Sequence, residues 1–164
     1  MKTPCAKFIK IMPFVIGVLS VSLAHGQQVP AASGDVKWVN APASLPAGAK
    51  LAILQGDLAK PGTLAFRLKL PAGYQLKPQS SPAIERIVVV SGTFNFGSGD
   101  QFDSARTIPM SAGYVHWPSK APYFGSAKEE TVLEIQGVGP FSVSYVNPGD
   151  DPTKKNQVSS SVIR

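Results

Sequence analysis

The stretch of residues 73–92, GYQLKPQSSPAIERIVVVSG, constrains the fold of this chain most strongly. It begins at Gly73, is broken by Pro78 and by the Ser-Ser-Pro run at 80–82, and ends in four β-branched residues before Ser91 and Gly92. β-Branched residues favour strands, whereas clusters of proline, glycine and serine favour turns. The stretch therefore predicts two short strands joined by a turn.

Short strand signals recur along the rest of the chain. Residues 64–70 are apolar at every even position, with Arg67 and Lys69 on the opposite face, which predicts a half-buried antiparallel strand. Further strands are predicted at 35–39, 51–54, 93–96 and 114–117, and a late hairpin is predicted from segments 131–137 and 141–146. No window has a 3.6-residue apolar period over three turns, and the 15 glycines and 15 prolines supply many turn signals. The sequence therefore predicts an all-β sandwich or barrel.

The first 26 residues have the pattern of a cleavable signal peptide. Lys2, Lys7 and Lys10 give a basic start, an apolar run follows at 11–24, and small residues precede a cleavage site before Gln27. The apolar run has about 14 residues, fewer than the ~20 that a membrane-spanning helix needs. An uncleaved membrane anchor is the alternative. We expect cleavage, a periplasmic or secreted location, and no membrane attachment of the mature protein.

Composition narrows the function classes further. Cys5 lies before the apolar run and leaves with the signal peptide, so we expect a mature chain without cysteine and without disulfides. The same cleavage removes three lysines and no acidic residue, which lowers the formal net charge from +6 to +3. No basic stripe interleaved with aromatic residues occurs, so the sequence does not predict nucleic-acid binding.

Residues 73–92 also carry the spacing of the first cupin motif: Gly, five residues, His, one residue, His, three or four residues, Glu, six residues, Gly. Gly73, Glu85 and Gly92 occupy its three non-histidine positions, whereas Gln79 and Ser81 stand at the two histidine positions. The chain resembles small exported single-domain cupins over about residues 38–152. The resemblance implies a jelly-roll β-barrel (RmlC-like) over 36–152, after a flexible lead-in at 27–35 and before a disordered tail at 153–164.

The second cupin motif is mostly lost. Only its proline is matched; its second glycine falls on Lys120 and its histidine on Tyr123. In metal-binding cupins, three histidines and a glutamate converge on one divalent ion. The corresponding positions here hold Gln79, Ser81, Glu85 and Tyr123. An amide, a hydroxyl, one carboxylate and a phenol do not make a strong transition-metal site, so the resemblance implies a cupin without metal or cofactor.

Glu85 has two interpretations. It can be a carboxylate inside the barrel whose pKa is raised by desolvation and which acts as a general acid or base. Alternatively, it is a structural carboxylate paired with Arg86, Arg67 or a water molecule. Tyr123 likewise either donates a hydrogen bond to an anionic ligand or fills the space that an imidazole and an ion would take.

Other polar residues complete the predicted ligand pocket. Gln79 and Ser81 share one face of their strand, and Glu134 and Gln136 share a face of theirs. For Glu134 and Gln136, a solvent-facing position is the alternative. His116, the only histidine after the signal peptide, is either a structural or surface residue or a catalytic one. The predicted pocket comprises Gln79, Ser81, Glu85, His116, Tyr123, Glu134 and Gln136.

These observations predict an exported cupin that binds a small polar molecule in its barrel and serves as a binding, sensor or accessory protein. The alternative is an enzyme centred on Glu85, either a metal-free isomerase or lyase or an atypical metal-dependent oxygenase. The sequence assigns no catalytic set, because fold alone does not select a chemistry. Because cupins commonly pair through sheet faces, a homodimer is a further expectation.

Overall fold

The computed structural model describes residues 36–154. The predicted signal peptide, the lead-in at 27–35 and tail residues 155–164 lie outside the described residues. Thr153 and Lys154, assigned above to the tail, belong to a helical turn, and the Thr153 N–H donates to Asp151 Oδ1 at 2.9 Å. Within the described part of the chain, no helix is long and apolar enough to cross a membrane.

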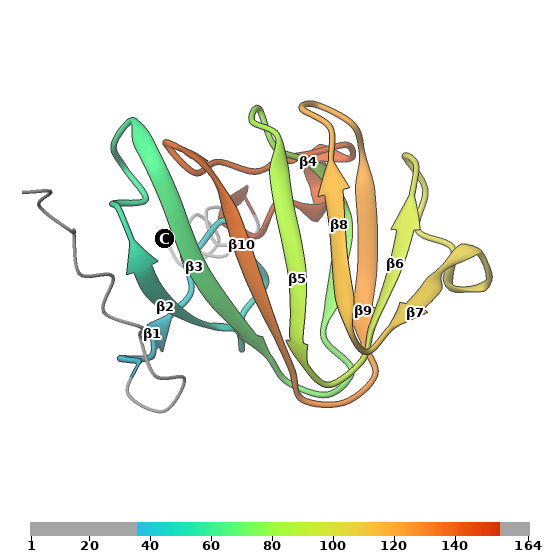
Figure 1. Ribbon diagram of the computed structural model, residues 1–164. Coiled ribbons are helices and arrows are strands. Elements are labelled where there is room, and N and C mark those ends of the chain that lie inside the picture. Colours follow the sequence, from blue (N-terminus) through green and yellow to red (C-terminus); the bar gives the residue numbers. More distant parts are fainter. Residues whose placement is uncertain (1–35, 155–164) are drawn as a thin grey trace, which may run out of the picture. The chain divides into compact units, whose positions relative to one another are not determined.

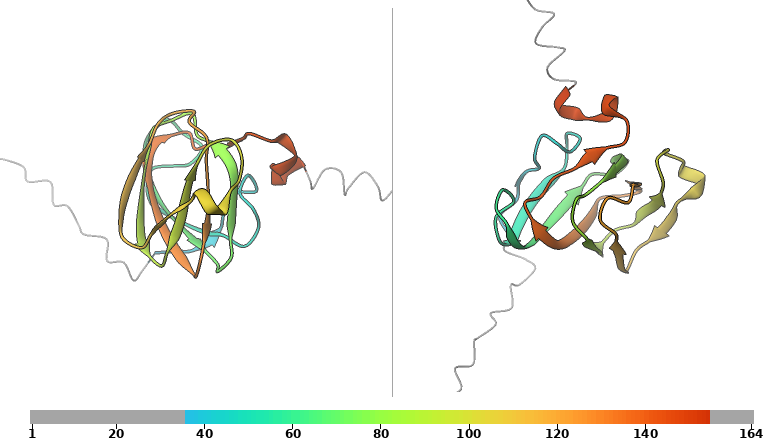
Figure 2. Two further views of the ribbon diagram at one scale, coloured as in Figure 1. Left: turned by 90° about the vertical axis from the view of Figure 1, so that its right-hand side faces the viewer. Right: turned by 90° about the horizontal axis from the view of Figure 1, so that it is seen from above.

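The described residues form two antiparallel sheets that face each other (Figures 1 and 2). The six-stranded sheet has the order β1 (Val39–Asn40), β2 (Lys50–Gln55), β3 (Gly62–Leu70), β10 (Thr131–Gly139), β5 (Glu85–Ser91) and β8 (Gly113–Trp117). The five-stranded sheet has the order β11 (Ser144–Tyr145), β4 (Gln75–Ser80), β9 (Tyr123–Ala127), β6 (Phe94–Ser98) and β7 (Ile108–Met110). A short 3-10 helix, η1 (Ser104–Arg106), lies between β6 and β7, and a second, η2 (Pro148–Asp150), follows β11. The predicted all-β jelly roll is confirmed.

The core lies between the sheets and follows from period-two alternation. On β3, the even positions 64–70 are buried, as the sequence predicts, while Arg67 and Lys69 lie on the outer face. The opposite sheet contributes Leu76, Phe94 and Phe96 to the same core. Because apolar side chains from both sheets share one interior, their burial holds the two layers together.

The predicted late hairpin is wrong. β10 pairs with β3 on one side and with β5 on the other, so neither of its edges is free for the segment that follows. That segment crosses to the other sheet, where β11 pairs with β4. The sequence did not predict β9, because glycine and serine interrupt this segment. It forms a strand because β4 pairs with it on one side and β6 on the other. The first strand is also shorter than predicted and begins only at Val39.

Backbone conformation explains two positions of the cupin motifs. Gly92 has φ of +78°, and a Cβ atom there would lie 2.4 Å from the Glu130 carbonyl oxygen. Only glycine fits such a turn without displacing the backbone. Lys120, at the position of the second motif's glycine, keeps a left-handed conformation with φ of +61° although it carries a side chain. Both positions therefore have the left-handed conformation that favours glycine.

Candidate functional site

Three polar side chains form a hydrogen-bonded chain across the interior of the barrel. Gln79 Nε2 donates to Tyr123 Oη at 3.4 Å, and Tyr123 Oη donates to Glu85 Oε2 at 3.3 Å. Their residues are 2%, 6% and 4% exposed, so all three lie inside the core. Gln79 and Tyr123 belong to the five-stranded sheet and Glu85 to the six-stranded one, so the chain of hydrogen bonds connects the two layers.

A local irregularity of β4 places Gln79 in the interior. Leu76 and Gln79 are both buried although they are three residues apart, which strict alternation along a strand does not allow. The pairing of β4 with β9 shifts register between these two residues, and Gln79 then lies opposite Tyr123. An irregularity of this kind turns a side chain to the other face of a sheet.

Burial sets the protonation of this group. Desolvation raises the pKa of Glu85 above its usual value, and the hydroxyls of Ser81 and Tyr123 act in the opposite direction without cancelling the effect. Burial and the neighbouring Glu85 charge raise the pKa of Tyr123, so its phenol stays protonated and remains a hydrogen-bond donor. The site therefore favours its uncharged forms.

Glu85 lies between two small internal cavities. The first has a volume of about 20 Å³ and the second about 10 Å³; both are lined by Phe66, Glu85, Ile135 and Phe141. Gln79 and Tyr123 line the first and Ser81 lines the second. The first cavity has the size of about one water molecule and is far below the ~300 Å³ of a typical ligand pocket. In this conformation the interior is closed to organic ligands.

One polar atom in the cavity has no partner. Gln79 Oε1 is fully buried and accepts no hydrogen bond. Leaving a buried acceptor unsatisfied costs about 1–3 kcal/mol, so such atoms are uncommon in folded proteins. The cavity lining is otherwise apolar apart from Glu85 and Tyr123, and it contains no lysine, arginine or histidine. The interior thus offers a free acceptor and no positive charge.

The residues at the cupin metal positions do not fit a transition metal. The single carboxyl group has a raised pKa and the phenol stays protonated, while an amide and a hydroxyl are weak ligands. Over residues 36–154, no three His, Cys, Asp or Glu side chains gather at one place. We therefore derive no chemistry through a metal ion.

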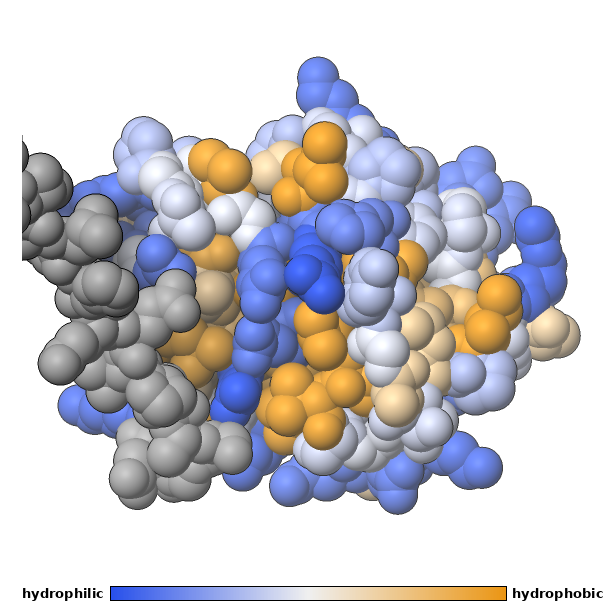
Figure 3. Space-filling model, viewed as in Figure 1, coloured by the Kyte–Doolittle hydropathy of each residue, from blue (hydrophilic) through white to orange (hydrophobic). Residues whose placement is uncertain are grey.

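Glu134 and Gln136 are not brought into the barrel. Leu133 and Ile135 of β10 point inward, so the even positions face outward, which is the alternative stated above. There Arg67 Nε donates to Glu134 Oε2 at 3.1 Å, and Gln136 Nε2 donates to Glu134 Oε1 at 2.8 Å. Figure 3 shows this outer face as a hydrophilic band between hydrophobic residues.

His116 also lies on the outer face. It is exposed on β8 opposite Arg86, and its ring contacts the edge of Tyr114 at a centroid distance of 5.4 Å. The Arg86 guanidinium lies 4.4 Å from the centre of the Tyr114 ring.

Of the seven predicted pocket residues, the structure gathers Gln79, Ser81, Glu85 and Tyr123 around the cavities. Glu85 pairs with neither Arg67 nor Arg86 there.

Sequence reasoning did not assign two cavity-lining residues that lie outside the strands. Leu45 lies in the loop between β1 and β2, and Phe141 follows β10; both line the first cavity. The Phe141 ring packs edge-on against Phe66 at a centroid distance of 5.1 Å. The available signal for Leu45 was an isolated apolar side chain within a loop of prolines, alanines and a glycine.

Comparison with solved structures supports the fold. The chain is similar to the polyketide cyclase RemF of Streptomyces resistomycificus, with a TM-score of 0.58, 16% identity, and coverage of 80% of this chain and 94% of that one. It is equally similar to a putative acetylacetone dioxygenase of Methylibium petroleiphilum, with a TM-score of 0.57, 16% identity and coverage of 79% and 89%. An RmlC-like cupin of Shewanella frigidimarina gives a TM-score of 0.50, 12% identity and coverage of 66% and 87%. At these identities the likeness establishes the cupin fold alone.

Comparison with family models is more specific. No curated protein matches this chain. Residues 26–144, which include the whole hydrogen-bonded chain of Gln79, Tyr123 and Glu85, match the family described as a domain of unknown function, DUF4437. The protein has the cupin fold and belongs to the DUF4437 family.

Proposed function

We propose that this protein binds a small, neutral, mostly apolar molecule that donates one hydrogen bond to Gln79 inside the barrel. The observation that carries the proposal is Gln79 Oε1, a buried acceptor without a partner in the lining of the interior cavity. A ligand hydroxyl or amine group would satisfy this atom, and the binding energy would include recovery of the desolvation cost.

The lining selects the ligand class. No cationic side chain lines the cavity. An anionic ligand would therefore lie in a medium of low polarity without a counter-charge, which disfavours its binding. The rings of Phe66, Phe94 and Phe96 offer apolar surface, while only three polar side chains are available. Phenols and other neutral apolar alcohols fit this lining better than organic acids or sugars do.

Binding requires the interior to open, because the cavity of about 20 Å³ admits no organic molecule. Leu45 and Phe141 both belong to connections, which are easier to displace than paired strands. A ligand would therefore bind by stabilising a conformation in which one of these side chains has moved.

Three matched probes test the proposal. Phenol carries a hydroxyl donor, anisole has the same ring without a donor, and benzoate carries a negative charge. We expect phenol to raise the melting temperature of the protein and to bind measurably by calorimetry, with anisole and benzoate weaker. Benzoate binding as tightly as phenol, or no stabilisation by any neutral donor, would contradict the proposal.

A substitution and its matched control locate the binding. Gln79→Met keeps the unbranched shape of the side chain and removes the amide, so it should abolish the preference for phenol over anisole. Gln136→Met makes the same change on the outer face of β10 and should leave the preference unchanged. An equal loss in both variants would mean that the amide of Gln79 does not contact the ligand.

The second candidate function is catalysis by Glu85. The raised pKa of Glu85 favours it, because a carboxyl group that titrates nearer neutral pH is a better general acid or base. Glu85→Gln separates the two functions. It would eliminate turnover of a substrate, whereas a protein that only binds its ligand would retain affinity for phenol.

Two expectations from the sequence also become proposals. We infer from residues 1–26 that the mature protein is periplasmic or secreted, and N-terminal sequencing of the exported protein would show Gln27 first. We also propose a homodimer, and light scattering coupled to size-exclusion chromatography would give twice the mass of one mature chain. A mass of one chain at micromolar concentration would rule the dimer out.

A further inference from the structure

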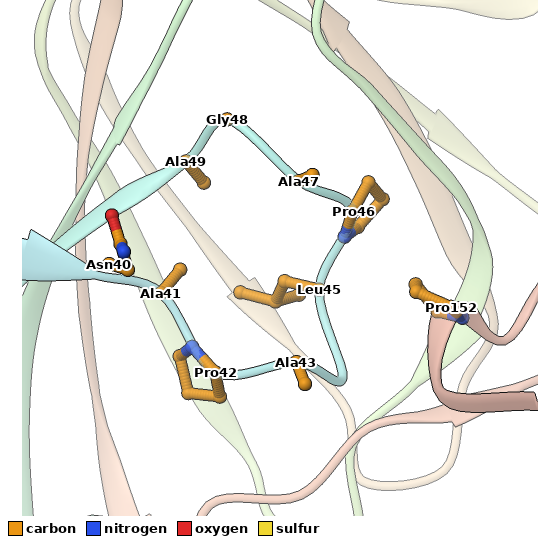
Figure 4. A pocket seen from close by; sticks show the side chains of 10 residues that line it. All are labelled: Asn40, Ala41, Pro42, Ala43, Leu45, Pro46, Ala47, Gly48, Ala49 and Pro152. Atoms are coloured by element: carbon orange, nitrogen blue, oxygen red, sulfur yellow. The ribbon is translucent and has the colours of Figure 1, made fainter. Parts of the chain in front are cut away.

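The loop between β1 and β2 encloses a pocket on the protein surface (Figure 4). Its volume is about 450 Å³, within the range typical of ligand pockets, in contrast to the interior cavity of about 20 Å³. The lining is made almost entirely by this one loop, with a proline from the C-terminal part of the described chain. The lining residues are Asn40, Ala41, Pro42, Ala43, Leu45, Pro46, Ala47, Gly48, Ala49 and Pro152.

Leu45 lines both the surface pocket and the interior cavity. Its residue is 4% exposed, so its side chain is packed inside the fold. Figure 4 shows its side chain on the inner side of the curved loop, pointing toward Ala41. Gln79, Tyr123 and Glu85 lie behind this leucine in the cavity lining. Leu45 is the one residue that the linings of the surface pocket and of the polar cavity have in common.

Hydrogen bonds to two side chains hold the backbone on either side of Leu45. Tyr145 Oη donates to the Ser44 carbonyl at 2.7 Å, and Tyr74 Oη donates to the Pro46 carbonyl at 2.6 Å. At the base of the loop, the Ala41 N–H donates to the Ala49 carbonyl at 3.1 Å. The Leu45 N–H itself donates to the Pro42 carbonyl at 2.9 Å, so the backbone of the loop is held. The Leu45 side chain lies outside any strand and can change its rotamer without breaking the pairing of a sheet.

We propose that this surface pocket is the outer part and the entrance of the ligand site, with Leu45 as the partition between them. The inference rests on the proposed function for the ligand, but the route follows from the geometry of the two cavities alone. A ligand would place its donor at Gln79 and its apolar body against the alanines and prolines of the loop once Leu45 has moved.

The lining of the pocket agrees with the ligand class proposed for the interior. No charged side chain lines it. Its single polar side chain, Asn40, is engaged by Lys50, whose Nζ donates to Asn40 Oδ1 at 2.7 Å. An outer pocket with mostly apolar side chains and no charge, which leads to one free acceptor, selects an elongated neutral molecule with a donor at one end.

Thiol labelling tests the route without any ligand. The full chain carrying Cys5→Ser and Gln79→Cys places the one cysteine of the protein in the lining of the interior cavity. Methyl methanethiosulfonate is small and neutral; the cysteine thiolate attacks its thiomethyl sulfur, forms a methyl disulfide and releases methanesulfinate. Labelling of the native protein reports how fast the reagent reaches residue 79.

Leu45→Ala should accelerate this labelling at least tenfold. Leu76→Ala is the matched control: Leu76 is also 4% exposed and lines the same cavity, but it does not line the surface pocket. Similar acceleration by both variants would indicate general loosening of the core and would overturn the proposal. If Phe141→Ala accelerates labelling and Leu45→Ala does not, the entrance lies at the second interior cavity, which Ser81 and Phe141 line. If Leu45→Ala fails to fold, Leu45→Val should give a smaller acceleration in the same direction.

A fluorescent neutral phenol separates this inference from the proposed function. For 2-naphthol, Leu45→Ala should raise the association and dissociation rate constants together, with a smaller change in affinity. If 2-naphthol binds no variant while the labelling difference between Leu45→Ala and Leu76→Ala persists, the proposed function fails and the entrance stands. If 2-naphthol binds to Leu45→Ala and to Leu76→Ala with the same rate constants, Leu45 does not control access to the cavity.

Discussion

Gln79 and Tyr123 lie directly opposite each other on β4 and β9, and the amide of one donates to the phenol oxygen of the other at 3.4 Å. In the cupins that this chain resembles, these two positions carry metal-binding histidines. Here they form, with Glu85, a buried chain of hydrogen bonds whose free end is the Gln79 carbonyl oxygen. The barrel therefore keeps a polar centre with one free hydrogen-bond acceptor, and the proposed ligand binding rests on that atom.

The stability of Glu85→Gln relative to the wild type should depend on pH. Because the folded state raises the pKa of Glu85, the wild type binds an extra proton on folding at pH values just above 4.5, where a free glutamate side chain titrates. Its free energy of unfolding should then fall, relative to that of Glu85→Gln, as the pH rises from 4.5 through the raised pKa. Urea unfolding of both proteins from about pH 4.5 to about pH 8 measures the difference. A difference that is constant with pH would mean that Glu85 titrates normally.

Glu134→Gln should destabilise the protein by about 1–2 kcal/mol without affecting phenol binding. Glu134 pairs with Arg67 on the outer face, where their side chains are only 18% and 15% exposed, so the ion pair is poorly screened. Denaturant unfolding gives the loss and calorimetry with phenol gives the affinity. A change in phenol affinity comparable to that of Gln79→Met would contradict the outward orientation of Glu134.

Lys120→Gly should stabilise the protein by up to about 1 kcal/mol. Lys120 has φ of +61°, a conformation that costs a residue with a side chain more than it costs glycine. Its N–H donates to the Ser81 carbonyl at 2.7 Å, and glycine retains this donor. Lys128→Gly is the control, because Lys128 is also exposed but does not have positive φ. This control should lose stability, and a similar loss in Lys120→Gly would refute the prediction.

Gly92→Ala should destabilise the protein by more than about 2 kcal/mol, since a Cβ atom would lie 2.4 Å from the Glu130 carbonyl oxygen and 2.6 Å from Thr131 Oγ1. Gly73→Ala is the comparison: Gly73 has nearly the same φ, +77°, but nothing lies within 4 Å of its Cβ position. Thermal unfolding of the two variants separates the cost of the close approach from that of the backbone conformation. Equal losses would show that the contact at Gly92 relaxes freely.

Tyr145→Phe should cost about 1 kcal/mol at neutral pH through loss of the hydrogen bond to the Ser44 carbonyl. Burial raises the pKa of Tyr145 to about 12, so the wild type keeps this bond while the free side chain would titrate near 10. The advantage of the wild type is complete below pH 10 and should fall as the pH rises toward 12. Unfolding at neutral pH and above pH 10 checks both parts; a constant difference would exclude a role for the hydroxyl proton.

Sequence periodicity by itself determined the fold class. Alternation at 64–70 and the absence of a helical period require β structure, because only a strand buries every second side chain. The spacing of Gly73, Glu85 and Gly92 placed the chain among the cupins, and both glycines have the positive φ that their turns require. The loss of the metal histidines was equally visible, since residue identity alone decides which ligands are available.

Only the tertiary structure decided which residues face the interior. A period of two implies that Glu134 and Gln136 share a face, but the pairing of β10 with β3 and β5 determines that this face is the outer one. The register shift in β4 that turns Gln79 inward includes Pro78, which in the sequence indicates a break but not which face the next side chain takes. The contact of Leu45 with both cavities depends on where a loop lies over the barrel. Local sequence determines conformation along the chain, whereas the site is made by side chains that meet only when distant strands pair.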